Sequence, residues 1–90
     1  MLKIVSSNQF KKDLKLAKKR GLDLEHLAEV VNTLAAQQPL GEKHRDHNLT
    51  GNYRGFRECH VQPDWLLIYR IEMDELELFL FRTGSHSDLF

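Results

Sequence analysis

The chain has 90 residues, of which 41% are hydrophobic and 29% charged, so it has the size and composition of one globular domain spanning residues 1–90. No apolar run approaches the roughly 20 residues that a membrane-spanning helix needs. The single Cys59 excludes an internal disulfide and a CxxC metal or redox motif. We therefore expect a cytoplasmic protein without membrane association, held together by packing alone.

The formal net charge is zero, but the charge is unevenly distributed along the chain. Residues 1–20 contain seven basic residues and one acidic residue, a local charge of +6. The remainder therefore carries six of the 13 basic and 12 of the 13 acidic residues. A basic block on a small domain favours binding to a polyanion. A solvated helix face is an alternative of equal weight.

The start of the chain predicts a strand followed by a helix. Lys3–Val5 is β-prone. Ser6 and Gln9 have the spacing of a capping box, so we expect the helix to begin at Ser6. Apolar residues then recur every three or four positions, and Gly21 is placed to end the helix in a left-handed conformation.

A second helix completes a predicted helical hairpin. It begins near Asp23 and ends by Pro39. The order helix, glycine, helix is typical of two antiparallel helices joined by a short turn. Residues 40–52 are polar and rich in glycine and asparagine, so we expect a loop, which carries His44 and His47.

The second half of the chain predicts a sheet. The expected strands are Phe56–Val61, Trp65–Tyr69 and Leu76–Arg82. The nearly continuous apolar run of the middle strand indicates burial on both faces. The order β-α-α-β-β-β predicts an α+β fold, with a small, mostly antiparallel sheet and a two-helix hairpin packed on one face.

Four side chains that transfer protons lie outside the predicted helices: His47, His60, Asp64 and His86. Each is placed in a loop or at a strand end, so they can converge at one edge of the sheet. Arg82 ends the last strand, and arginine binds phosphate and stabilises the charge of a phosphoryl transition state. This combination indicates a metal-independent ribonuclease.

A metal site is the alternative interpretation of the same histidines. Zinc ligands usually come in close pairs such as HxxxH or CxxC, whereas His60 and His86 are far apart in the sequence. Cys59 is adjacent to His60, but neighbouring strand residues point to opposite faces. We therefore predict no metal site and no cofactor.

Three stretches of the second half carry a family resemblance: Asp46–Gly51, Tyr53–Tyr69 and Arg82–Phe90. They contain the patterns DHxLxGxxxGxRxxHVxPDWLLIY and RTGxHxxLF. In combination these patterns resemble the YafQ branch of the RelE/ParE superfamily, bacterial toxins of type II toxin–antitoxin systems. The basic first half is compatible with that family but does not identify it.

The resemblance implies a RelE-like fold and an endoribonuclease that cuts the mRNA codon in the ribosomal A site. It implies that His47, His60, Asp64 and His86 form the acid–base set. We take His86 as the acid that protonates the leaving 5′-oxygen. The base stays open among the other three, because coupled groups can share a proton.

The resemblance also implies RNA-binding residues. Arg82 would contact the phosphate, and Phe90, which is alternatively a plug for the tail, would contact a base. Trp65, whose simpler interpretation is a core residue, would help to shape the RNA site. Glu58 stands where the family often has an aspartate, and its role is left open. The first helix would bind ribosomal RNA through Lys11, Lys15, Lys18 and Lys19.

The implied partners are a cognate antitoxin, the 70S ribosome and mRNA. We expect a monomeric free toxin and a heterotetramer or larger assembly with the antitoxin. Two other functions remain as alternatives: a ParE-like toxin that acts on DNA gyrase without cutting RNA, and a degenerate module that only binds the antitoxin. The intact histidine and aspartate set argues against both.

Overall fold

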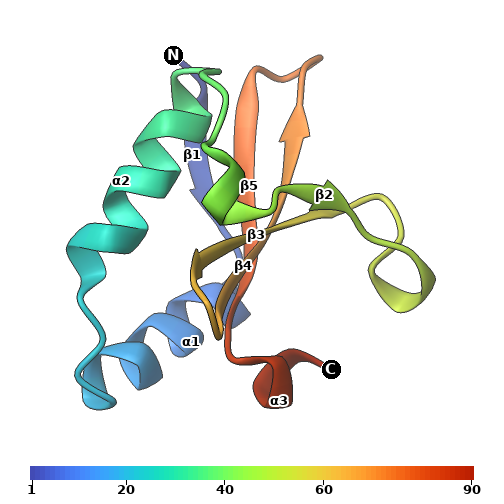
Figure 1. Ribbon diagram of the computed structural model, residues 1–90. Coiled ribbons are helices and arrows are strands. Elements are labelled where there is room, and N and C mark those ends of the chain that lie inside the picture. Colours follow the sequence, from blue (N-terminus) through green and yellow to red (C-terminus); the bar gives the residue numbers. More distant parts are fainter.

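The computed structural model describes all 90 residues and contains a five-stranded mixed sheet with the strand order β1-β5-β4-β3-β2 (Figure 1). Only β1 and β5 are parallel, and the other neighbours are antiparallel. The predicted α+β class with a mostly antiparallel sheet is therefore confirmed. The strands are β1 (Lys3–Ser6), β2 (His47–Asn48), β3 (Arg57–Gln62), β4 (Trp65–Glu72) and β5 (Glu77–Gly84). The helices are α1 (Asn8–Lys19), α2 (Leu24–Ala35) and α3 (His86–Leu89), with 3₁₀ turns at Glu42–His44 and Gly51–Tyr53.

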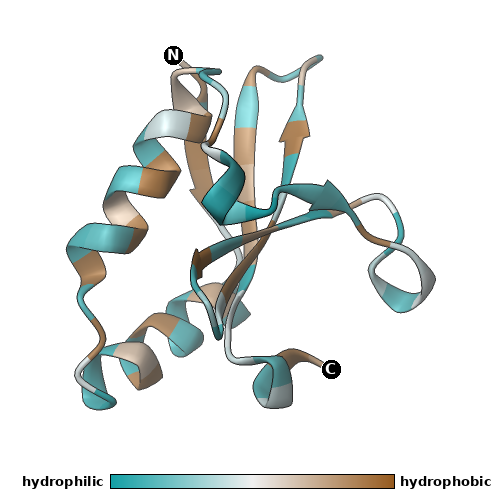
Figure 2. Ribbon diagram, viewed as in Figure 1, coloured by the Kyte–Doolittle hydropathy of each residue, from teal (hydrophilic) through white to brown (hydrophobic).

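Both faces of the central strand β4 are covered. On one face, Leu67 and Tyr69 join the main core beneath α1 and α2, and on the other, Leu66 and Ile68 pack against Leu89 of α3. Figure 1 shows α1 and α2 on one side of the sheet and α3 on the other, with β2 at the edge of the sheet beside β3. Apolar stretches mark the central strands, whereas apolar and polar residues alternate along α1 and α2 (Figure 2). The two helices contact the strands more than each other, because each has its own apolar stripe facing the sheet.

The predicted N-cap of α1 is displaced by one residue. Ser6 belongs to β1, where it pairs with Leu80, so the cap is Ser7. The Ser7 hydroxyl accepts a hydrogen bond from the Phe10 amide at 2.9 Å and donates one to the Phe81 carbonyl at 2.6 Å. This single side chain begins the helix and ties it to β5.

The glycine that was expected to end α1 does so. Gly21 has φ +76°, the left-handed region that favours glycine. Its amide donates to the Lys18 carbonyl, and the Leu22 amide donates to the Ala17 carbonyl, both at 3.1 Å, which is the Schellman pattern. Asp23 then caps α2 through the Glu25 amide, as its position predicts.

Two elements were not predicted. The segment expected to be a plain loop contains β2, in which His47 pairs with Glu58 and Asn48 with Arg57 of β3. The C-terminal tail forms the short helix α3. Neither two strand residues nor one helical turn is long enough to show a hydrophobic period.

A register shift near the end of β5 reverses the alternation of its side chains. Ile68 pairs with Arg82 but the next residue, Tyr69, pairs with Leu80, so Phe81 is left without a partner. As a result Thr83 turns toward the helix-covered face. None of the three helices has the length and hydropathy that crossing a membrane requires.

We expect Leu67→Ala to lower the free energy of unfolding by about 2–5 kcal/mol, because Leu67 is fully buried in the central strand. Leu16→Ala is the matched control, since Leu16 is 42% exposed on α1, and it should change stability by less than about 0.5 kcal/mol. Urea denaturation measures both. Equal losses would contradict the placement of the core.

Candidate functional site

The contact between Asp64 and His86 joins the β3–β4 turn to the first residue of α3. Asp64 Oδ1 accepts a hydrogen bond from the His86 backbone amide at 3.0 Å and lies 2.7 Å from His86 Nδ1. These two hydrogen bonds, the backbone one first, lower the pKa of the Asp64 carboxyl. An ionised carboxylate only accepts, so Nδ1 carries the hydrogen and Nε2 is left for a substrate.

A buried carboxylate lies between the other two histidines. Glu58 is 5% exposed, and its Oε1 is 3.6 Å from His47 Nε2 and 3.5 Å from His60 Nε2. His47 is directly opposite Glu58 in the β2–β3 pairing, and His60 is two residues further along the same strand face. The role of Glu58 was left open by the sequence, although its i, i+2 spacing from His60 in a predicted strand was a usable signal.

Carbonyl groups orient the same two imidazoles. His60 Nδ1 lies 3.2 Å from the Pro63 carbonyl, and His47 Nδ1 lies 2.6 Å from the Arg45 carbonyl. Both rings therefore keep their Nδ1 hydrogen on the backbone and turn Nε2 toward Glu58. A proton on either Nε2 lies next to a carboxylate, an arrangement suited to proton exchange.

The fold brings the His60 and His86 rings together, with centroids 5.8 Å apart. All four predicted acid–base residues thus lie at one edge of the sheet. His86 is hydrogen-bonded to Asp64 and lies beside His60. His47 lies near His60 because both approach the Glu58 carboxylate. The convergence that the sequence predicted is present, and it includes one carboxylate more than expected.

His60 and His86 are far apart in the sequence, but the fold brings their donor atoms close together, which the spacing of the residues did not indicate. Donor atoms of Glu58, His60 and His86 all lie within 4.8 Å of one another, because β3 and the start of α3 meet in space. One carboxylate oxygen and two imidazole nitrogens form a donor set that zinc or copper accepts. Cys59 takes no part: it is buried in the main core on the other face, and burial raises the pKa of its thiol to about 12.

An arginine clamps the residues on both sides of His47. Arg57 Nη1 donates to Asn48 Oδ1 at 2.7 Å, and Arg57 Nη2 lies 3.2 Å from Asp46 Oδ2. Asp46 also accepts a hydrogen bond from the Tyr69 hydroxyl, and burial together with this contact raises the pKa of Tyr69. The two-residue strand β2 is therefore held by side chains at the position that turns His47 toward Glu58.

The C-terminal helix is anchored at its start. Ser85 and Asp88 form a capping box, and Arg20 donates to both Asp88 oxygens, at 2.6 and 3.1 Å. A Cβ on Gly84 would lie 2.9 Å from the Asp88 Cβ, so this close approach requires glycine. These contacts fix the first turn of α3 and with it His86.

The predicted RNA-binding residues differ in accessibility. Phe90 is 62% exposed, its ring stands edge-on to Tyr53 at 5.2 Å, and its centroid is 6.5 Å from that of His86. Arg82 is paired with Asp13 of α1. Lys11, Lys15, Lys18 and Lys19 are all exposed on α1.

The placement of Trp65 among the RNA-contacting residues is wrong. Its side chain is 2% exposed and its indole N–H donates to Thr83 Oγ1 at 2.9 Å. The register shift in β5 brings Thr83 to this face, so the indole has a buried hydrogen-bond partner. The alternative interpretation of Trp65 as a core residue holds.

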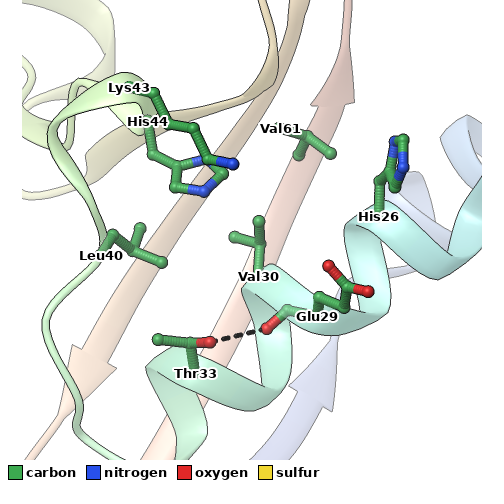
Figure 3. Close-up of a pocket in the computed structure, with 8 residues that line it drawn as sticks. All are labelled: His26, Glu29, Val30, Thr33, Leu40, Lys43, His44 and Val61. Carbon is green, nitrogen blue, oxygen red and sulfur yellow. Dashed lines mark hydrogen bonds between the residues drawn. The ribbon is translucent and has the colours of Figure 1, made fainter.

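A small pocket of about 210 Å³ lies behind the site, between α2 and the 3₁₀ turn at residues 42–44 (Figure 3). His44 and Lys43 line one side of it, and His26 and Glu29 line the other. His44 Nδ1 lies 2.7 Å from the His60 carbonyl, and this contact holds the 3₁₀ turn against β3. The pocket contains none of the four acid–base residues.

Comparison with known proteins now identifies the family. The sequence profile described as the bacterial toxin of type II toxin–antitoxin system, YafQ, matches residues 2–90. The chain belongs to the YafQ toxin family. It is 44% identical over 85 residues to the mRNA interferase toxin YafQ of Escherichia coli K12, covering 93% of this chain and 90% of that protein.

Solved structures of YafQ and related toxins share the fold. The metal-bound toxin from Helicobacter pylori is 53% identical with a TM-score of 0.94, and the two chains cover each other fully. The toxin of the E. coli DinJ–YafQ toxin–antitoxin complex is 40% identical with a TM-score of 0.87, covering 100% of this chain and 99% of that one. The chain is thus a type II toxin with the fold of YafQ.

The ion pair that anchors α3 makes stability depend on pH. Hydrogen bonds from Arg20 and from the Ser85 amide lower the pKa of Asp88, so the folded protein holds the Asp88 proton less tightly than the unfolded chain. This contribution is complete above the unfolded pKa of about 4 and is lost as the pH falls below it. We expect the urea midpoint of Asp88→Asn to fall less steeply between about pH 5 and pH 2 than that of the wild type.

Asp74→Asn, in the exposed β4–β5 turn, is the control and should keep the wild-type slope. Parallel slopes for the wild type and Asp88→Asn would contradict the assignment.

Proposed function

We propose that the protein is an endoribonuclease that cuts mRNA in the ribosomal A site and so inhibits translation. One observation carries this proposal: the exposed pair His86–Asp64 meets the pair His60–Glu58 at one edge of the sheet. The similarity to E. coli YafQ, an mRNA interferase toxin, supports the same reaction class.

The chemistry is an internal transfer at phosphorus that needs no metal. The ribose 2′-oxygen attacks the scissile phosphorus, a P–O2′ bond forms and the P–O5′ bond breaks. One group accepts the 2′-OH proton and another donates a proton to O5′, which leaves a 2′,3′-cyclic phosphate and a free 5′-hydroxyl. We assign the acid to His86, because its side chain is 56% exposed and Asp64 holds its Nδ1, which leaves Nε2 to donate to O5′.

We assign the general base by comparing the surroundings of Asp64, His47 and His60. Asp64 is a poor proton acceptor, since hydrogen bonds to His86 lower its pKa and occupy Oδ1. His47 and His60 both point Nε2 at Glu58, which can share the proton that either ring accepts. We therefore assign the base function to these two histidines with Glu58 behind them.

Substrate contacts follow from exposure and charge. Phe90 offers a base-stacking surface beside His86. The lysines of α1 form an exposed basic face for ribosomal RNA, where phosphate neutralisation makes binding depend on salt. Because the ribosome presents the mRNA, the toxin itself needs few contacts with it.

We also propose a cognate antitoxin as partner, as for the E. coli YafQ that was solved with DinJ. The free toxin would be a monomer and the complex a heterotetramer or larger assembly. Binding near His86 would silence the toxin.

Primer extension in a purified translation reaction tests the function. We expect cuts at codons in frame when the mRNA is on ribosomes, and no cuts in the same mRNA when it is free. Equal cleavage of free mRNA would contradict ribosome dependence. DNA damage with intact mRNA in expressing cells would favour the gyrase-directed alternative.

In the same assay we expect His86→Ala to lower the cleavage rate roughly 10²- to 10⁴-fold, the usual loss when a general acid is removed. His26→Ala is the matched control, because His26 lies on α2 and contacts Gln62 and Asp23 but none of the four acid–base residues. Thermal denaturation should show both variants folded. Wild-type cleavage by His86→Ala would exclude His86 as the acid.

We further propose that Glu58, His60 and His86 bind a divalent transition metal that blocks catalysis. Their converging donors and the similarity to a metal-bound H. pylori toxin support this. Cu²⁺ or Zn²⁺ should inhibit cleavage, and a chelator should restore it. Calorimetry should show binding lost in His60→Ala and retained in His47→Ala, whose residue lies outside the donor set. Stimulation of cleavage by the metal would contradict a metal-independent reaction.

A further inference from the structure

Asp13 is the one acidic residue among the first 20, and it is buried on an otherwise lysine-rich helix. Its side chain is 8% exposed. Its oxygens accept hydrogen bonds from Arg82 Nε at 2.8 Å, Arg82 Nη2 at 3.3 Å, the Thr83 amide at 3.1 Å and Gln9 Nε2 at 3.1 Å. Because the buried Asp13 carboxylate accepts from four donors, any other orientation would leave some of these hydrogen bonds unmade, so its position is fixed.

The contact uses one side of the Arg82 guanidinium and leaves the other free. A guanidinium has five N–H donors in a planar fork. Asp13 takes the Nε hydrogen and one hydrogen on Nη2, so both Nη1 hydrogens and the second Nη2 hydrogen remain. That remaining end has the spacing of two phosphate oxygens. With its side chain 24% exposed, Arg82 can present this end to a ligand.

We propose that Asp13 is a positioning residue for phosphate binding: it locks the Arg82 guanidinium so that its free end meets the scissile phosphate. The inference rests on the nuclease function proposed above. The hydrogen bond to the Thr83 amide adds to the lock, because it fixes the backbone of β5 just after the register shift. Asp13 therefore connects the RNA-binding helix α1 to the strand end that carries the phosphate-binding side chain.

Positioning and simple charge neutralisation predict opposite results. If Asp13 only reduced the positive charge of Arg82, removing its charge would strengthen binding to RNA. If Asp13 orients the guanidinium, Asp13→Asn disturbs the contact, because both Asp13 oxygens accept from Arg82 and the amide nitrogen therefore meets an Arg82 donor in either orientation. The loss then appears in the chemical step.

Single-turnover cleavage of ribosome-bound mRNA separates the two. We expect Asp13→Asn to lower the maximal rate roughly 10- to 100-fold, as expected for a misplaced catalytic contact, with little change in the toxin concentration for half-maximal rate. Ser7→Ala is the control, since it removes another α1–β5 hydrogen bond without touching Arg82. It should lower the thermal midpoint but keep the rate.

A double-mutant cycle shows whether Asp13 acts through Arg82. Arg82→Lys keeps the charge and loses the planar fork, so cleavage is reduced but measurable. In that background Asp13→Asn should cause little further loss. Multiplied losses, an unchanged rate for Asp13→Asn, or an equal rate loss in Ser7→Ala would overturn the inference. Absence of cleavage by the wild type would instead refute the proposed function itself, and a wild-type rate for Arg82→Lys would remove the planar fork from the mechanism.

Discussion

The hydrogen bonds between Asp64 and His86 are the contacts on which the site depends. They join residues 22 apart in the sequence and place an imidazole at the start of a four-residue helix. A helix of this length is not stable alone, because the conformational free energy needed to form the first turn exceeds the free energy gained from its few hydrogen bonds. It persists through tertiary contacts: the Arg20–Asp88 ion pair at its start, and the carbonyl of buried Leu89, which accepts a hydrogen bond from Tyr53 at 2.7 Å. His86, to which we assign the role of the acid, is thus held in place by the fold and not by its own segment.

The site contains two carboxylates in different surroundings, and we assign them different roles for that reason. Asp64 is exposed, hydrogen-bonded by His86 and ionised, so in the proposed reaction it orients the acid. Glu58 is buried beside His47 and His60, so in the same proposal it serves the base. A metal ion bound to Glu58, His60 and His86 would compete with the proposed reaction, because the same three side chains would serve both.

The sequence predicted the elements that have a clear local cause. The central strand follows from its apolar run, the end of α1 from Gly21, and the start of α2 from Asp23. It also predicted that four proton-transferring residues would converge. It did not predict β2 and α3, because these short elements are held in place by side-chain hydrogen bonds, such as those of Arg57 and Asp88, and not by a local sequence pattern. The burial of Trp65 was not predicted, because Trp65 is next to Asp64 in the sequence. The convergence of donor atoms from Glu58, His60 and His86 was not predicted either, because His60 and His86 are far apart in the sequence.

In the proposed reaction, this cluster drives attack of a ribose 2′-hydroxyl on the neighbouring phosphate. The sharpest test replaces the nucleotide on the 5′ side of the cut with its 2′-deoxy form in an otherwise identical ribosome-bound mRNA. The nucleophile is then missing while the toxin, the ribosome and the codon are unchanged. We expect complete loss of cleavage at that position and a 2′,3′-cyclic phosphate end on the product of the unmodified mRNA. Cleavage of the 2′-deoxy mRNA at the normal rate would exclude the 2′-hydroxyl as the nucleophile.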